Sequence, residues 1–145
     1  MTARLTRLFA AVLLLAGGLI HYDLWNAGYR HIPRIGPLFI ANCILSVAIA
    51  ATLVVTRRAT VAAAGIILAA GSLTALVLSR TTGLLGFTET AWTPQAINTL
   101  LAEAGAIVTL GVVLGLQLRV AHHQYRPEAR LDDPSGRDNP VASAV

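Results

Sequence analysis

The chain has 145 residues, of which 55% are hydrophobic and only 12% are charged. An average soluble domain is about one-quarter charged, so this composition excludes an ordinary soluble protein and indicates a membrane protein. The net charge of +4 does not indicate nucleic-acid binding, because the arginines stand at the ends of apolar runs and share no amphipathic face. We therefore expect the lipid bilayer, and not nucleic acid, as the partner of this chain.

Four long apolar runs follow one another, and each is long enough to cross a bilayer as a helix. A hydrocarbon core roughly 30 Å thick needs about 20 helical residues. We predict helices over residues 5–22, 35–56, 59–79 and 94–118. The predicted fold class is all-α, a four-helix transmembrane bundle that forms one domain of residues 1–125. The polar segment 126–145 is predicted to be a disordered cytoplasmic tail.

The first predicted helix follows Arg4 and Arg7 and ends without a small-x-small cleavage site, so we interpret it as a retained helix. An irregular outer stretch, residues 23–37, contains glycines and prolines that break helices. His21, just before this stretch, invites a haem interpretation, but a second axial histidine at membrane depth is missing. We therefore expect no cofactor and interpret His21 as an interfacial side chain.

The second and third predicted helices are separated only by Arg57 and Arg58, so they must be antiparallel neighbours. The second helix carries Asn42, a polar residue at the depth of His21. The single cysteine, Cys43, excludes an intramolecular disulfide and a paired-cysteine metal site.

Arginines near the helix ends predict the orientation, because the cytoplasmic side of a membrane protein carries an excess of positive charge. Most tyrosines and tryptophans fall on the arginine-poor side, as expected for rings at a membrane interface. The arginine-rich side contains Arg4, Arg7, Arg57, Arg58, Arg119, Arg126 and Arg130. We predict a multi-pass plasma-membrane protein with both termini in the cytoplasm.

The fourth predicted helix contains a single carboxylate, Glu103, about two turns from its outer end. A charged carboxylate in hydrocarbon is costly unless it is paired, protonated or hydrated, so Glu103 should face the bundle interior or a wet cavity. We predict a polar pocket open to the outside, with Glu103 at its floor and Arg80 as its counter-ion. The candidate binding residues are Glu103, Arg80, Asn42, His21 and Asn98. The structural alternative is that Glu103 only fixes helix register.

Two further patterns receive structural interpretations. His122 and His123 are adjacent and would point about 100° apart on a helix, so we expect no metal site there. Gly111 and Gly115 form a GxxxG spacing, and the third helix is rich in small residues such as Gly65 and Ser72. We favour packing within the bundle over a homodimer interface for these small residues.

The stretch HYDLWNAGYRHIPRIGPLFIANCILS, residues 21–46, resembles the pattern H-x-x-L-W-x-x-G-Y-x-x-I-P-x-I-G-x-L-F of small four-helix integral membrane proteins of actinobacterial type. The likeness extends more weakly to the segment GLLGFTET and to the helix of Glu103. It implies membrane residence and little about activity.

Three classes of function stay open at this stage. We favour a non-catalytic accessory or binding protein that holds a ligand in the pocket, contacts a membrane-protein partner or forms a homo-oligomer. The first alternative is an oligomeric proton-coupled transporter or small channel in which Glu103 titrates. The second is a haem or quinone redox subunit around His21. A transporter needs polar residues in the inner half, which offers mainly Thr52, Thr109 and Gln117.

Overall fold

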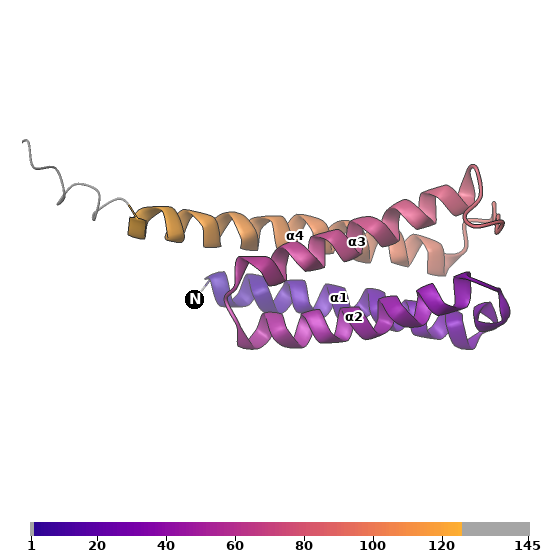
Figure 1. Cartoon of the computed structure of the whole chain (residues 1–145), viewed down its shortest axis with the longest axis horizontal. Coiled ribbons are helices and arrows are strands. Elements are labelled where there is room, and N and C mark those ends of the chain that lie inside the picture. The colour runs from indigo at the N-terminus through magenta and orange to yellow at the C-terminus, as the bar shows by residue number, and fades with distance from the viewer. Residues whose placement is uncertain (1, 126–145) are drawn as a thin grey trace, which may run out of the picture.

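The computed structural model describes residues 2–125, and its four long elements are all helices (Figure 1). The elements are α1 (Thr2–Asn26), a short 3-10 helix η1 (Tyr29–His31), α2 (Ile35–Val55), α3 (Ala59–Arg80) and α4 (Pro94–Tyr125). Each of the four α-helices has the length and composition needed to span a membrane. The all-α, four-helix prediction is confirmed, and the predicted tail of residues 126–145 lies outside the described residues.

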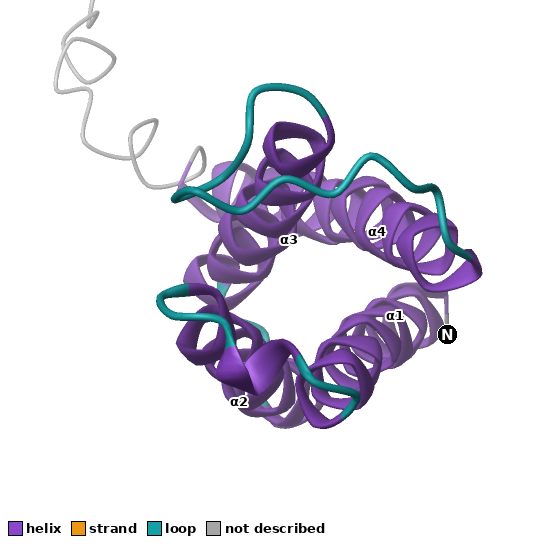
Figure 2. Ribbon diagram, turned by 90° about the vertical axis from the view of Figure 1, so that its right-hand side faces the viewer, coloured by secondary structure: helices purple, strands orange, loops and turns teal. Residues whose placement is uncertain are grey.

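The helices form an up-and-down bundle, and Figure 2 shows them in a ring in the order α1, α2, α3, α4. The start of α1, the α2–α3 connection and the end of α4 lie at one end of the bundle, which we call the short-loop end (Figure 1). The other end, called the long-loop end, carries η1 and the α3–α4 loop of residues 81–93. In Figure 1, α2 and α3 lie close together at the short-loop end and diverge toward the long-loop end.

Two helices extend beyond their predicted limits. α1 continues through Asp23 to Asn26, where the sequence predicted an irregular loop, and α4 continues well past Leu118. The reason is that hydropathy marks the limits of the apolar run, whereas arginine and glutamine are good helix formers outside it. α2 and α3 agree with their predicted limits to within one residue.

The buried core is built from alanine, leucine and valine side chains in the half of the bundle nearer the short-loop end. Glycine and alanine let helix backbones approach closely where lipid supplies no hydrophobic drive for association. A Cβ placed on Gly65 of α3 would lie only 2.8 Å from Leu110 Cδ1 of α4, so a side chain at this position would have to displace the end of the Leu110 side chain. The core consists of Ala10, Ala11, Leu14, Ala50, Leu53, Ala62, Ala69, Ala106, Leu110 and Val113, and we call it the alanine–leucine core.

Gly111 and Gly115 of α4 do not take part in this packing. Both are exposed, and no described atom lies within 4 Å of a Cβ placed on either residue. The predicted role in intramolecular packing is therefore wrong for this pair, although it is right for Gly65. The physical reason is that α4 is apolar around much of its circumference, so hydropathy does not determine which face points inward.

The long-loop end is folded back toward the bundle. Gly36, at the start of α2, would bring a Cβ within 2.7 Å of the Arg30 carbonyl oxygen, so glycine lets η1 sit directly against α2. In the α3–α4 loop, Leu84 and Phe87 exchange backbone hydrogen bonds of 2.8 Å around Leu85 and Gly86. This tight turn directs Leu84 and Phe87 toward the space between α2 and α3.

Candidate functional site

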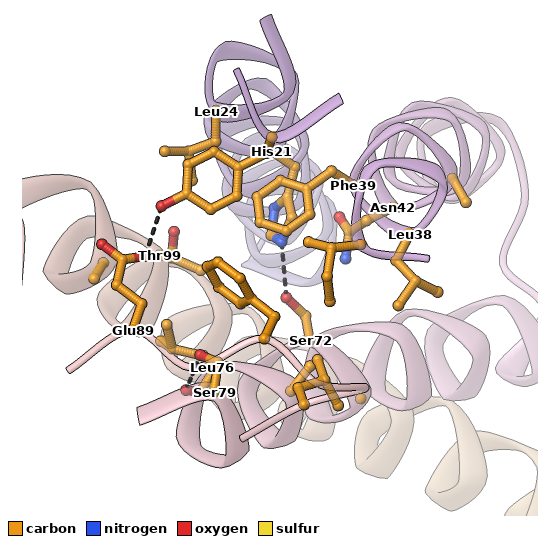
Figure 3. A pocket seen from close by; sticks show the side chains of 18 of the residues that line it. His21, Leu24, Leu38, Phe39, Asn42, Ser72, Leu76, Ser79, Glu89 and Thr99 are labelled. Carbon is orange, nitrogen blue, oxygen red and sulfur yellow. Dashed lines mark hydrogen bonds between the residues drawn. The ribbon is translucent and has the colours of Figure 1, made fainter. Parts of the chain in front are cut away.

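A cavity of about 380 Å³ lies between α2 and α3 in the half of the bundle nearer the long-loop end (Figure 3). Its lining on α3 runs from Ile67 to Arg80, which corresponds to about 20 Å of helix. Leu38, Leu45 and Ile67 line it and are also exposed, so the cavity reaches the outer surface of the bundle between the two helices. We call this cavity the α2–α3 groove.

The long-loop end of the groove is spanned by three polar side chains, which we call the Tyr29–Glu89–Arg80 network. Arg80 Nη1 lies 3.1 Å from Glu89 Oε2 and donates to the Glu89 carbonyl oxygen at 2.6 Å. The Tyr29 hydroxyl donates to the same Oε2 at 2.6 Å. The network therefore ties η1 to the α3–α4 loop and to the last residue of α3.

Burial makes this network a structural connection rather than a loose surface pair. The Arg80 side chain is 8% exposed and that of Glu89 is 25% exposed. Burial, together with the hydrogen bond to Glu89, raises the pKa of Tyr29 to about 12, so the phenol remains a donor at neutral pH. Among the described residues, Arg80 Nε is buried without a hydrogen-bond partner, which leaves one donor beside the groove unused.

The predicted pairing of Arg80 with Glu103 is wrong, since Arg80 pairs with Glu89. Ser72, the α3 side chain beside Glu103, precedes Arg80 by eight residues, or about 12 Å along the helix. An arginine at the last residue of α3 therefore reaches a carboxylate in the following loop more readily than one two turns deeper in the bundle.

Deeper in the bundle, His21, Ser72 and Glu103 connect three helices, and we call them the His21–Ser72–Glu103 chain. His21 Nδ1 lies 2.8 Å from the Gly17 carbonyl oxygen, and His21 Nε2 lies 3.2 Å from Ser72 Oγ (Figure 3). The Ser72 hydroxyl also lies close to the Glu103 carboxyl group. Glu103 is 4% exposed and His21 is 8% exposed, so the chain is an interior one.

Glycine at position 17 provides the space for the Glu103 carboxyl group. A Cβ placed on Gly17 would lie 3.2 Å from Glu103 Oε1, and the Gly17 carbonyl also accepts the hydrogen bond of His21. The prediction that Glu103 faces the bundle interior is confirmed. His21 and Ser72 line the groove whereas Glu103 does not, so Ser72 joins the groove to Glu103.

The two asparagines among the candidate residues lie on different faces. Asn42 of α2 is buried, lines the groove and accepts a hydrogen bond of 3.2 Å from Ser46. Asn98 of α4 is exposed and is not part of the groove lining. Thr99, one residue later, occupies the groove wall instead, and its hydroxyl donates to the Gln95 carbonyl at 2.9 Å.

Aromatic rings connect the two polar clusters along the groove. The Phe39 ring centroid lies 5.2 Å from that of His21 and 5.1 Å from that of Tyr29. Phe87 makes an edge contact with Tyr29 at 5.8 Å. These tilted and stacked pairs have the spacing at which aromatic rings attract one another. They hold η1, the start of α2 and the α3–α4 loop together around the long-loop end of the groove.

Three functional candidates were absent from the sequence prediction of the pocket: Tyr29, Ser72 and Glu89. Ser72 reads as a small packing residue, although a hydroxyl inside an apolar helix is also a hydrogen-bonding group. Glu89 is the only carboxylate of the α3–α4 loop and follows Arg80 by nine residues, which is the signal that could have identified their pairing. Tyr29 carries no local signal, because its contact with Glu89 joins two separate loops.

The described residues contain no group of three or more histidine, cysteine, aspartate or glutamate side chains placed to hold a metal ion. Both ring nitrogens of His21 have protein partners, and His31 instead lies 3.0 Å from Arg30 Nε in η1. The comparisons give no further guide, because no protein-family model, curated protein or solved structure matches the chain. The function therefore has to be inferred from the site itself.

Proposed function

We propose that this protein is a multi-pass plasma-membrane protein with cytoplasmic termini that binds a small lipid-soluble molecule in the α2–α3 groove and has no catalytic activity of its own. The groove carries the proposal, since its volume of about 380 Å³ lies within the range of roughly 300–1,000 Å³ typical of small-molecule pockets. Such pockets combine mostly apolar walls with a few placed polar groups, as this groove does.

The position of the groove supports entry of the ligand from the bilayer. Its exposed rim of Leu38, Leu45 and Ile67 belongs to helices that are apolar enough to span a membrane. An apolar body can therefore lie between α2 and α3. A hydroxyl or carbonyl group of the ligand can meet Ser72 and Asn42 in the middle of the groove or Arg80 at its end.

The other half of the bundle favours binding over transport. Toward the short-loop end, the space between the helices is filled by the alanine–leucine core, including the fully buried Ala106 and Leu110 on the α4 turns that follow Glu103. A transported ligand would need a polar or open path through this region. The role is therefore that of a binding or accessory protein.

Filling the groove tests this function. Gly71 lines the groove, and no described atom lies within 4 Å of a Cβ placed there, so Gly71→Leu adds a side chain whose Cβ meets no neighbour. Gly111→Leu is the matched control, since Gly111 has equally open surroundings outside the groove. The full-length proteins are extracted with native lipid, and the bound small molecules are quantified by mass spectrometry.

We expect one compound to be retained by the wild type and by Gly111→Leu but reduced about tenfold in Gly71→Leu, which corresponds to roughly 1.4 kcal/mol of binding free energy. An identical set of bound compounds in all three proteins would show that the groove is not a binding site.

A further inference from the structure

We infer that the ligand of the α2–α3 groove is one unbranched acyl chain of an ester-linked membrane lipid, with its ester carbonyl at Arg80 and its chain end toward the middle of the bilayer. This inference rests on the proposed function, because it names the class of molecule that the groove binds and the direction in which that molecule lies. Three observations support it: the dimensions of the groove, its depth in the membrane and one unpaired hydrogen-bond donor.

The groove is long and narrow. Its lining covers residues 35–45 of α2 and 67–80 of α3, which correspond to about 15 Å and 20 Å of helix. A volume of about 380 Å³ spread over these lengths gives a mean cross-section of roughly 19–25 Å². Such an opening is about 5 Å across, which suits a single file of carbon atoms, since carbons in contact lie about 3.5–4.0 Å apart. Two chains side by side, or a fused ring system, would need about twice this area.

The length of the groove determines the length of the chain. A fully extended polypeptide advances about 3.3–3.6 Å per residue, that is, for every three backbone bonds. An extended hydrocarbon chain has similar bonds, so about 15–20 Å of groove holds roughly 12–18 carbon atoms, the range of ordinary membrane acyl chains. Figure 3 shows apolar side chains along this space, with Leu38 of α2 on one side and Leu76 of α3 on the other.

The groove has the depth of one leaflet. α3 has 22 residues, or about 33 Å, so it spans a hydrocarbon core roughly 30 Å thick. Arg80 is its last residue, and the Arg80 Cζ lies 5.8 Å from the ring centroid of Trp92, an exposed tryptophan of the kind found at membrane interfaces. Ile67 lies about 20 Å deeper, in the middle region of the bilayer. A lipid of this leaflet therefore has its ester groups at the level of Arg80 and its chain ends at the level of Ile67.

Arg80 supplies the polar contact. Of the buried side-chain nitrogen and oxygen atoms in the described groove lining, only Arg80 Nε lacks a hydrogen-bond partner. The polar side chains in the middle of the groove already have partners, since His21 bonds to Ser72 and Asn42 accepts a hydrogen bond from Ser46. An ester carbonyl at the groove end would accept the free hydrogen bond of Arg80, and the apolar chain beyond it needs no polar contact.

The charge at the groove end favours a neutral acceptor over an anion. Glu89 Oε2 lies 3.1 Å from Arg80 Nη1, so the guanidinium already has a counter-ion. The carboxylate of a free fatty acid would lie beside the Glu89 carboxylate and be repelled by it. An ester carbonyl has no charge and avoids this repulsion. The occupant is therefore an esterified chain rather than a free fatty acid.

Photocrosslinking locates both ends of the chain. The full-length protein is reconstituted with phosphatidylcholine that carries a diazirine on one palmitoyl chain, either at the last carbon or beside the ester. After illumination, the labelled residues are identified by peptide mass spectrometry. We expect the terminal diazirine to label Leu68, a half-buried residue of the deep lining. The diazirine beside the ester should label Phe87, a half-buried residue of the α3–α4 loop.

Filling the groove provides the control for lipid that only surrounds the bundle. Gly71→Leu lies between the two labelled levels and should reduce both signals about tenfold, whereas Gly111→Leu, outside the groove, should leave them unchanged. The reverse pattern of labels, or labels that Gly71→Leu does not reduce, would overturn the inference.

The failure of this inference is distinct from the failure of the proposed function. If the native compound that Gly71→Leu loses is a quinone, an isoprenoid or another molecule without an acyl chain, the groove is still a binding site but the inference is wrong. If no native compound depends on Gly71, both are wrong.

Competition separates the two sources of an acyl chain. Methyl palmitate and palmitic acid have the same chain, and at about pH 9 only the acid is charged. We expect methyl palmitate to displace the photoactivatable lipid from Leu68, and palmitic acid to be about tenfold less effective. Stronger competition by the acid would overturn the assignment of an esterified chain and identify the groove as a fatty-acid site.

Discussion

The two halves of the bundle are built from the same four helices but are held together differently. Near the short-loop end, alanine and glycine bring the backbones together, as at Gly65 against Leu110. Near the long-loop end, α2 and α3 are separated by the groove and are joined through side chains, including Phe39 with Tyr29 and the loop residue Glu89 with Arg80. The helices of one half are held together by close packing, and those of the other half by specific polar and aromatic contacts.

This difference teaches where function can be accommodated in so small a membrane domain. Close helix packing leaves no space for a ligand, and it seals one end of the bundle. Polar contacts hold the other end together while they leave a groove open between α2 and α3. If this comparison is right, equivalent substitutions in the two halves should have unequal effects.

The largest difference should follow from truncating a leucine in each half. Leu110→Ala removes a completely buried side chain of the alanine–leucine core and should lower the free energy of unfolding by about 2–5 kcal/mol. Leu76→Ala should cost much less, because Leu76 already borders the groove. Unfolding in detergent mixtures, followed by circular dichroism, measures both. Equal losses would mean that the two halves are packed alike.

Adding a side chain to α3 should give the next largest contrast. Gly65→Leu forces a side chain against Leu110 and should cost about 1–3 kcal/mol of unfolding free energy. Gly71→Leu lies on the same helix in open surroundings and should leave stability unchanged or slightly higher, because leucine is the better helix former. The same unfolding assay applies, and a similar cost at both positions would contradict the comparison.

The Tyr29–Glu89–Arg80 network should contribute less than the core. Glu89→Gln removes the charged acceptor of both Arg80 and Tyr29 and should lower the free energy of unfolding by about 1–2 kcal/mol. Asp23→Asn is the matched control, since it neutralises an exposed carboxylate in the last turn of α1, at the same end of the bundle. Equal stability of the two variants would show that Glu89 contributes no more to the free energy of unfolding than an exposed carboxylate does.

The sequence predicted the features that follow from the membrane and missed those that depend on side-chain direction. Bilayer thickness requires about 20 residues per span, so four apolar runs indicate four helices, and the cost of a buried carboxylate places Glu103 inside. Rotation of an apolar helix is not determined in this way. Asn98 is therefore exposed while Thr99, about 100° around the helix, faces the groove.

The partners of Arg80 show the same limit for loops. Its choice of Glu89 over Glu103 depends on how residues 81–93 fold back, and this follows from the tight turn at Leu84 and Phe87 rather than from any periodic pattern. The contact of Tyr29 with Glu89 joins residues that are 60 positions apart. Such pairings require the tertiary structure.

The smallest effect concerns the proton of Tyr29. An ordinary phenol has a pKa of about 10, whereas burial first, and Glu89 second, raise the pKa of Tyr29 to about 12. Because the unfolded chain then loses this proton at lower pH than the folded one, the stabilisation is complete below about pH 10 and is lost as the pH rises toward 12. The phenolate absorbance of wild type minus Tyr29→Phe reports the titration.

In Glu89→Gln we expect the pKa of Tyr29 to move only part of the way back, because burial is the larger cause and remains in the variant. A full return to about 10 would mean that Glu89 alone holds the proton on the phenol and that the ring is open to water. An unchanged value would mean that the hydroxyl does not contact Glu89 in the membrane. Either outcome would show how much of the raised pKa comes from the packing around Tyr29 and how much comes from its contact with Glu89. In the wild type Tyr29 makes both kinds of contact, with Phe39 and with Glu89.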